Sequence, residues 1–535
     1  MNRTFVRPLS ALWILAAAIP SSRAGAQTYN HAVDVQHYRF SLQLNDSNNN
    51  IRGEASVTVQ FREDIKNFSL DLTRKNAGSK GMIVSSVKEG SKPVRFSQDS
   101  VKLVLLTVAG SGSVHTYTIK YAGTPADGLI IANNKFGRRG FFGDNWPDRA
   151  HNWLPCVDHP SDKATVEFLI TAPDHYEVVA NGKKEKEALL PGHLKQTHWK
   201  ESVPLSPKVM VIGVADFAID HPGDVDGIPI YSYVFKENKD IGFRSYAVAK
   251  EILPFYIKKI GSYPYEKLGN VQSKTRFGGL ENASAIFYFE NSVDSKGVES
   301  LMAHEIAHQW FGDAATETEW YHLWLSEGFA TYMTHLYLEN KYGIDTLKKG
   351  MATDRRKLIA FEKKRYTPVV DTAVNGDYMQ LLNPNSYEKG GWVLHMLRRK
   401  LGDDLFWKGI DDYFAAYKNR NASTIDFEHV METAGGQPLE NFFREWLYTP
   451  GHPSLAVNWK YQAGDGSTGM LILHIDQKQN TLFEFPLEYS IDGTLHTILV
   501  KEKTTTVNLP LDARPSAIVM DPNVNILADF EVSGQ

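Results

Sequence analysis

The first part of the chain alternates polar and apolar positions in short runs. Residues 35–44 and 55–61 follow this alternation, and the polar cluster at residues 45–50 separates them as a turn. A period of two predicts strands that bury one face, and clusters of Asn, Asp and Ser predict the turns between strands. We therefore expect a β-rich N-terminal domain over residues 27–230.

The period changes over residues 231–450, where apolar positions recur every three or four residues. This spacing predicts helices that bury one face. The clearest helical runs are residues 247–260, 298–311 and 327–342, with a further pair over 424–446 that is split at Gly435-Gly436. We expect a mainly helical domain here.

Alternation returns over residues 451–535, as in residues 454–459, 471–475 and 497–500. Gly and Asp turns between these runs predict a small β-sandwich. The fold class expected for the whole chain is therefore multidomain α+β, with two β domains on either side of a helical one.

The first 26 residues have the features of a secretory signal peptide. Arg3 and Arg7 supply positive charge, residues 9–19 are apolar, and Ala24-Gly25-Ala26 provides small residues for cleavage before Gln27. A retained membrane anchor is the alternative, but the apolar run is short for a bilayer. We expect a periplasmic or secreted protein, cleaved after Ala26 and without stable membrane insertion.

Charge and cysteine content narrow the possible partners. The 58 basic and 62 acidic residues give a net charge of −4, and no run of Lys or Arg predicts nucleic-acid binding. Cys156 is the only cysteine, which excludes an intramolecular disulfide. Stability must come from buried apolar surface.

The most specific chemistry lies within the helical run at residues 298–311. His304 and His308 are one helical turn apart, so both imidazoles project from one face and can bind one metal ion. Glu305 lies beside them and can act as a general base toward water. Glu327, on the next helical run, completes a His₂Glu set. Three protein ligands and one open position are typical of a catalytic zinc site, so we expect one Zn²⁺ per chain.

A solvated helix surface is the alternative interpretation of this pattern. The flanking residues argue against it, because most of the helix is apolar and a buried polar cluster requires a partner. The apolar positions are Val298, Leu301, Met302, Ile306, Ala307, Trp310 and Phe311.

Four motifs in order resemble the M1 family of zinc aminopeptidases, the gluzincins that include aminopeptidase N and leukotriene A4 hydrolase. They are Phe277-Gly278-Gly279-Leu280-Glu281-Asn282, then residues 304–312, 324–330 and 387–390, and residues 153–165 are similar to a stretch of the family's N-terminal domain. The resemblance spans roughly residues 150–450. It implies a saddle-shaped β domain followed by a thermolysin-like catalytic domain.

The resemblance also implies roles for individual residues. The family's G-x-M-E-N motif has Leu280 in place of Met here, and it implies that Gly278, Gly279, Glu281 and Asn282 bind a peptide substrate. Glu281 would pair with the ammonium group of a free N-terminus. Tyr387 would donate a hydrogen bond to the tetrahedral intermediate.

Two positions depart from the family pattern. A carboxylate usually stands where this chain has Thr334, which implies altered zinc binding unless His322 or Glu319 compensates. Glu or Gln often stands where an ungapped count puts Trp146. The first side-chain pocket would then be more aromatic, or Asp144 would take the polar role.

The expected function is removal of neutral or hydrophobic N-terminal residues from peptides. The alternatives are an epoxide hydrolase activity like that of leukotriene A4 hydrolase, an endopeptidase, and a non-catalytic peptide-binding scaffold. The preferred residue, the natural substrate and the oligomeric state stay open.

Overall fold

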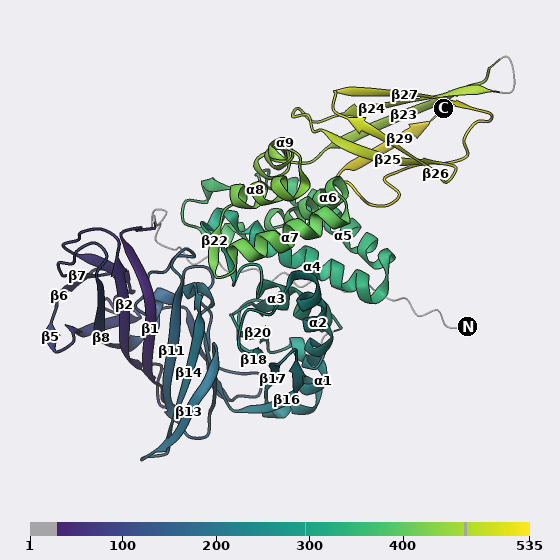
Figure 1. The fold of residues 1–535 in the computed structure, drawn as a ribbon. Helices are drawn as coiled ribbons and strands as arrows, with labels where there is room; N and C mark the ends of the chain where they lie inside the picture. The colour runs from purple at the N-terminus through teal and green to yellow at the C-terminus, as the bar shows by residue number, and fades with distance from the viewer. Residues whose placement is uncertain (1–28, 295, 465–467, 535) are drawn as a thin grey trace.

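The computed structural model describes residues 29–294, 296–464 and 468–534. The predicted signal peptide lies outside these residues. Within them, no helix combines the length and the hydropathy that a membrane crossing needs. Figure 1 shows the N-terminal strands, the helical region and the C-terminal sandwich following one another along the molecule.

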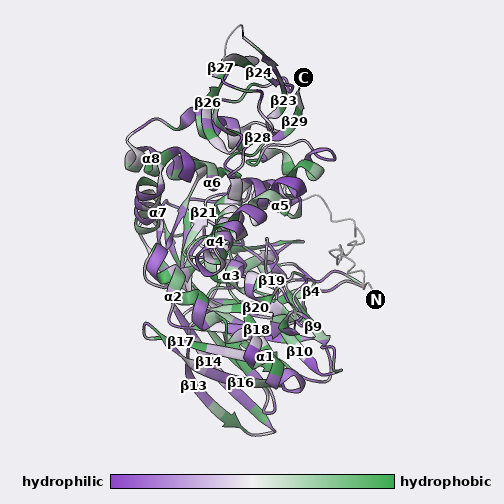
Figure 2. Ribbon diagram, turned by 90° about the vertical axis from the view of Figure 1, so that its right-hand side faces the viewer, coloured by the Kyte–Doolittle hydropathy of each residue, from purple (hydrophilic) through white to green (hydrophobic). Residues whose placement is uncertain are grey.

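The N-terminal domain is built around an eight-stranded sheet of order β13-β14-β11-β1-β2-β8-β4-β5, flanked by the smaller sheets β3-β7-β6 and β12-β15-β10-β9. The strands are β1 (Val33–Gln43), β2 (Ile51–Phe61), β3 (Phe68–Asp71), β4 (Gly81–Glu89), β5 (Lys92–Pro93), β6 (Arg95–Gln98), β7 (Lys102–Leu106), β8 (Val114–Thr124), β9 (Leu129–Asn133), β10 (Arg139–Gly143), β11 (Ala164–Pro173), β12 (Glu177–Ala180), β13 (Lys183–Leu190), β14 (Leu194–Leu205) and β15 (Ile212–Ala215). β1 pairs antiparallel with β2 and parallel with β11. Figure 2 shows hydrophobic and hydrophilic residues interleaved along these strands, as the alternation predicts.

The middle region begins with a five-stranded sheet of order β16-β17-β18-β20-β19, which the helical prediction over residues 231–450 missed. Its strands are β16 (Phe217–Val225), β17 (Ile228–Phe235), β18 (Leu268–Ser273), β19 (Gly279–Leu280) and β20 (Ala285–Phe289). The expected boundary at residue 230 therefore falls inside β17. Alternation identifies a strand, but it does not show which sheet the strand joins.

The described residues contain nine α-helices. The predicted helical runs coincide with α2, α3, α4 and α8–α9. The helices are α1 (Lys239–Tyr246), α2 (Ala249–Ile260), α3 (Val298–His308), α4 (Trp324–Tyr342), α5 (Ile344–Glu362), α6 (Gly390–Leu401), α7 (Asp403–Tyr417), α8 (Thr424–Gly435) and α9 (Glu440–Phe443). The predicted break is confirmed, because α8 ends at Gly435 and Gly436 follows in the left-handed region with φ of 62°.

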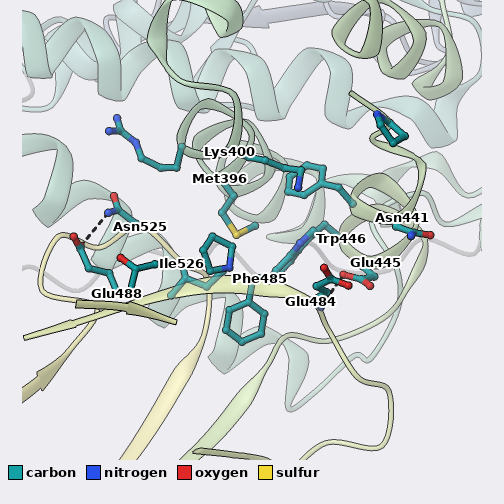
Figure 3. A pocket seen from close by; sticks show the side chains of 15 residues that line it. Met396, Lys400, Asn441, Glu445, Trp446, Glu484, Phe485, Glu488, Asn525 and Ile526 are labelled. Atoms are coloured by element: carbon teal, nitrogen blue, oxygen red, sulfur yellow. Dashed lines mark hydrogen bonds between the residues drawn. The ribbon is translucent and has the colours of Figure 1, made fainter. Parts of the chain in front are cut away.

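The C-terminal domain packs the sheet β27-β24-β23-β29 against the sheet β26-β25-β28. Its strands are β23 (Ser454–Gln462), β24 (Gly469–Gln477), β25 (Phe485–Ile491), β26 (Thr494–Val500), β27 (Thr504–Leu511), β28 (Ile518–Met520) and β29 (Asp529–Gly534). A cavity of about 380 Å³ lies where this domain meets the helices, between Met396, Lys400 and Trp446 on one side and Phe485 and Glu488 on the other (Figure 3).

Two lysines of the N-terminal domain reach the segment that connects α3 to α4. The Lys208 ammonium pairs with the Glu317 carboxylate, and both side chains are buried. Lys163 Nζ donates to the carbonyl oxygens of Asp313 at 2.8 Å and Ala314 at 2.7 Å. The β domain therefore supports the segment that leads into α4.

Helices α4 and α6 approach each other closely at two glycines. A Cβ atom on Gly328 would lie 2.8 Å from the carbonyl carbon of Gly390, and one on Gly390 would lie 2.9 Å from the Cα of Gly328. Real Cβ atoms do not come this close to backbone, so the crossing requires glycine on both helices.

Replacing Gly328 with Ala should therefore push α4 away from α6. We expect Gly328→Ala to lower the free energy of unfolding by about 1–3 kcal/mol, the usual cost of overpacking. Thermal and urea unfolding would measure the loss, and Asn340→Ala, on the exposed last turn of α4, should leave stability nearly unchanged. Equal stability of Gly328→Ala and the wild type would contradict the tight crossing.

Candidate metal centre and active site

Three side chains from two helices converge on one point. α3 presents His304 and His308, and α4 presents Glu327. The two imidazole Nε2 atoms are 3.1 Å apart, and Glu327 Oε2 lies 3.2 Å from His304 Nε2 and 3.3 Å from His308 Nε2. Tetrahedral zinc with bonds of about 2.0 Å separates its ligand atoms by about 3.3 Å. The triangle of ligand atoms therefore fits Zn²⁺.

Charge at this point also suits a cation. Burial by itself raises the pKa of the Glu327 carboxyl, but His308 and His304 hold that pKa below its ordinary value, so the carboxylate stays ionised. The described residues contain no other group of three His, Cys, Asp or Glu side chains close enough to hold a metal. The sequence prediction of this cluster agrees with the geometry.

His308 is oriented by two neutral groups behind it. Its Nδ1 lies 3.1 Å from the Phe311 carbonyl oxygen and 3.1 Å from Ser326 Oγ. If Nε2 binds a metal, Nδ1 carries the proton and donates it to these oxygens. Gly312 makes room for the serine, because a Cβ there would lie 2.2 Å from Ser326 Oγ and the residue has φ of +118°.

Glu305 faces the cleft beside the ligands and contacts strand β19. A Cβ atom on Gly279 would lie 2.2 Å from Glu305 Oε1, so the glycine leaves space for this carboxylate in its present position. Burial raises the pKa of Glu305 well above its ordinary value, and although His308 opposes this, the Glu281 carboxylate adds to it. Glu305 is therefore a group that can hold a proton.

Glu281 lines the same cleft, and one of its carboxylate oxygens lacks a hydrogen-bond partner among the described residues. Its side chain is 5 % exposed, and its Oε1 has no hydrogen-bond partner in the part of the chain that the structure describes. Burial raises its pKa, while His308 and Lys208 lower it. Gln309 Nε2 donates to the Glu281 carbonyl oxygen at 2.7 Å and fixes the backbone.

Tyr387 closes the cleft from the π-helical turn η8 (Asn385–Lys389), directly before α6. Its ring is stacked on that of His304, with centroids 6.0 Å apart and planes at 9°. Burial, and then the nearby Glu327 carboxylate, raise the pKa of Tyr387 well above its ordinary value, so its hydroxyl keeps its proton.

These groups surround one cavity of about 280 Å³. Its lining contains eight of the nine predicted site residues together with five apolar side chains. The lining residues are Trp146, Phe277, Gly278, Gly279, Leu280, Glu281, Leu301, His304, Glu305, His308, Glu327, Leu382 and Tyr387.

Comparison with known proteins agrees with this arrangement. The model of the peptidase M1 N-terminal domain matches residues 34–207, and the model of the peptidase family M1 domain matches residues 244–446. The chain belongs to peptidase family M1. The expected resemblance and the expected fold class are thus confirmed.

Individual relatives share limited sequence identity with this chain. "Probable aminopeptidase 2" of Sulfurisphaera tokodaii is 28% identical over 397 residues, which are 70% of this chain and 49% of that protein. Glutamyl aminopeptidase of Rattus norvegicus is 27% identical over 453 residues, 79% of this chain and 48% of that protein. The chain thus spans about half the length of these curated relatives.

The match to a solved structure covers nearly the whole of the matched protein. The crystal structure of an M1 zinc metallopeptidase from Deinococcus radiodurans has a TM-score of 0.68 and 26% identity, and the match covers 80% of this chain and 96% of that one.

Two residues that the sequence suggested as substrate contacts, Asn282 and Asp144, do not line the cavity of this M1 family member. Asn282 is fully buried, and neither its side-chain oxygen nor its nitrogen has a partner among the described residues, but it does not line the cavity. Its predicted contact with substrate stays a prediction. Asp144 is also buried, where it pairs with Arg149 and accepts from the Arg276 backbone N–H at 3.1 Å.

The groups proposed to compensate for Thr334 are engaged elsewhere. His322 Nδ1 lies 2.9 Å from Thr424 Oγ1, and Glu319 Oε2 lies 3.3 Å from His159 Nε2. Thr334 itself donates to the Ala330 carbonyl oxygen at 2.8 Å, within α4. Ser326 was not predicted as a site residue, although its place directly before Glu327 was a usable signal.

Removing the serine hydroxyl should weaken metal binding. We expect Ser326→Ala to lower the affinity for zinc by about 10–100-fold, because the ligand His308 loses one of two acceptors. Competition with a chromogenic chelator would measure the affinity without reference to activity. Thr334→Val is the matched control and should bind zinc like the wild type, and equal affinities of all three proteins would refute the orienting contact.

Proposed function

We propose that the chain is an aminopeptidase that holds one Zn²⁺ and removes the N-terminal residue from peptides. The observation that carries the proposal is the unpartnered Oε1 of Glu281, which lies on the same cavity wall as the ligand set. A buried carboxylate oxygen without a hydrogen-bond partner favours a bound cation that can donate to it. The ammonium group of a peptide N-terminus is such a cation, with a pKa near 7.7–8.0.

Glu305 acts on the proton of the attacking water. When bound, zinc supplies a Lewis acid that polarises the scissile carbonyl and lowers the pKa of water. Glu305 accepts the proton from the water and passes it to the leaving amine. Its raised pKa supports this role, because a more basic carboxylate accepts a proton from water more readily.

The other groups orient the substrate and stabilise charge. Glu281 pairs with the ammonium group and so limits cleavage to the first peptide bond. The glycines at 278 and 279 let the substrate backbone approach. Tyr387, which keeps its proton, donates a hydrogen bond to the oxyanion that develops during attack.

The cavity also has apolar lining residues, which we assign to the first side-chain pocket. Trp146, Phe277, Leu301 and Leu382 contribute to it, and the Trp146 ring packs edge-on against Phe277 at 6.1 Å between centroids. This lining favours neutral, hydrophobic N-terminal residues.

The alternatives receive less support. Two carboxylates, Glu281 and Glu305, face the cavity and favour an amine over the uncharged chain of a lipid epoxide. The convergence of His304, His308 and Glu327 favours an enzyme over a scaffold.

Export to the periplasm or medium, with cleavage after Ala26, is also proposed, on the pattern of the first 26 residues alone.

Glu305→Gln should remove proton transfer and keep the shape of the site. We expect kcat to fall by about 10²–10⁴-fold on aminoacyl-aminocoumarins, with metal content and unfolding temperature unchanged. Stripping zinc from the wild type with a chelator should give a comparable loss that added Zn²⁺ reverses. A Glu305→Gln protein that retains zinc and full activity would contradict the proposed base.

Glu281→Gln should act on recognition of the free amine. Losing a hydrogen bond between charged groups costs about 1.5–3 kcal/mol, so kcat/KM for Leu-aminocoumarin should fall by about 10–150-fold. Rates on a peptide and on its N-acetylated form test the role directly, because the preference for the free amine should shrink in this variant. An unchanged preference would remove the carboxylate from amine binding.

A further inference from the structure

The π-helical turn η8 holds Tyr387 mainly through the contacts of its neighbours. The Lys389 backbone N–H donates to the carbonyl oxygen of Pro384, five residues back, at 2.8 Å and closes the turn. Such turns are rare overall and concentrate at functional sites. The backbone N–H of Tyr387 itself makes only a long hydrogen bond, 3.4 Å from the Asn383 carbonyl oxygen. Contacts of the adjacent residues therefore help to fix Tyr387.

Lys389 anchors this turn to the segment that leads into the C-terminal domain. Its side chain is fully buried, and its Nζ donates to the carbonyl oxygens of Gly451 at 2.6 Å and Thr449 at 3.3 Å. Glu362, the last residue of α5, supplies the opposite charge, with its Oε1 3.9 Å from the ammonium nitrogen. A buried ammonium group is unfavourable without such partners, so the lysine is held in one position.

The same carboxylate connects the turn to the C-terminal sandwich. Glu362 pairs with His452 Nδ1, and His452 Nε2 lies 3.7 Å from Asp529 Oδ1 on β29. The backbone between these contacts is closely packed, because a Cβ atom on Gly451 would lie 2.5 Å from the Tyr366 hydroxyl oxygen. Figure 1 shows α5 and α6 on the side of the helical region that faces this sandwich.

Asn385 anchors the other end of the turn, two residues before Tyr387. It is 1% exposed, and its Nδ2 donates to the carbonyl oxygens of Thr367 at 2.9 Å and Pro368 at 3.3 Å. Tyr387 thus lies midway between two buried side chains, each of which donates to backbone oxygens of a different segment. This arrangement fixes the turn on both sides of the phenol.

We propose that Lys389 is a positioning residue for Tyr387, with Asn385 as the second anchor of the turn. The inference rests on the proposed function, in which the Tyr387 hydroxyl donates to the oxyanion. An apolar side chain of similar length would fill the same space, but only a donor fixes the turn relative to the two carbonyl oxygens. Lys389 does not line the metal cavity, so it acts through the geometry of the turn.

A purely structural role for Lys389 is the alternative. It predicts a loss of stability without a specific effect on the transition state. A positioning role predicts that kcat falls while KM and zinc content stay the same, because the phenol acts on charge that develops only during attack.

A double-mutant cycle between Lys389→Met and Tyr387→Phe separates the two roles. On Leu-aminocoumarin, well below the unfolding temperature, Tyr387→Phe should lower kcat by about 10²–10³-fold. Lys389→Met should lower kcat by about 10–100-fold and change KM less than about threefold, because a donor displaced by about 1 Å loses much of its effect. In the Tyr387→Phe protein, Lys389→Met should lower kcat less than about threefold, since no hydroxyl remains to be misplaced.

Lys357→Met is the matched control. Lys357 Nζ lies 3.1 Å from Oε1 of Glu388 in the same turn, but the lysine side chain is 57% exposed. Exposed ion pairs contribute little, so kcat of this variant should stay within about twofold of the wild type. Zinc content and unfolding temperature are measured for every variant.

Asn385→Leu provides a second cycle with Tyr387→Phe and should show the same coupling. This cycle decides the question if Lys389→Met does not fold, and losses that are independent of the Tyr387 hydroxyl would overturn the positioning role. Full kcat in folded, zinc-loaded Lys389→Met would also overturn it.

Failure of the proposed function gives a different pattern. A Tyr387→Phe protein with full kcat would remove the oxyanion role of the phenol and this inference with it. A loss in Tyr387→Phe without any loss in Lys389→Met would overturn the inference and leave the proposed function intact.

Discussion

The glycine contact between α4 and α6 positions two elements that line the cavity. Gly328 directly follows Glu327, and Gly390 begins the helix that Tyr387 leads into. Because these two backbones touch, the proposed metal ligand Glu327 and the phenol of Tyr387, which stacks on His304, are both positioned next to this contact. Helix α3, which packs against α4, carries His304 and His308, the other two proposed ligands. The close packing of Gly328 against Gly390 thus contributes to the position of side chains in the proposed active site.

Charge around the cleft is balanced across the domain boundary. Glu281, Glu305 and Glu327 are buried within one catalytic region, and this concentration of carboxylates would be unfavourable without cations. Part of the compensation comes from Lys208, which belongs to the N-terminal domain, pairs with Glu317 and acts on Glu281. The β domain is therefore part of the electrostatics of the site as well as its neighbour.

The features that could be predicted from sequence are those with a local cause. His304, Glu305 and His308 share one helix, so their spacing alone predicts that they converge, and the break at Gly435-Gly436 follows from backbone preferences. The membership of β16 and β17 in the catalytic sheet could not be predicted, because strand partners are chosen by packing far along the chain. Asn282 shows the same limit, since its motif neighbours line the cavity while its own side chain turns into the core.

The contact between Gly279 and Glu305 has a consequence for how this site can change. The strand proposed to receive the substrate backbone and the proposed proton carrier share one surface, and the glycine hydrogen is all that separates them. A larger residue on the strand would displace the carboxylate along with the substrate. A substitution at Gly279 is therefore expected to change substrate preference at this edge and the rate of proton transfer together.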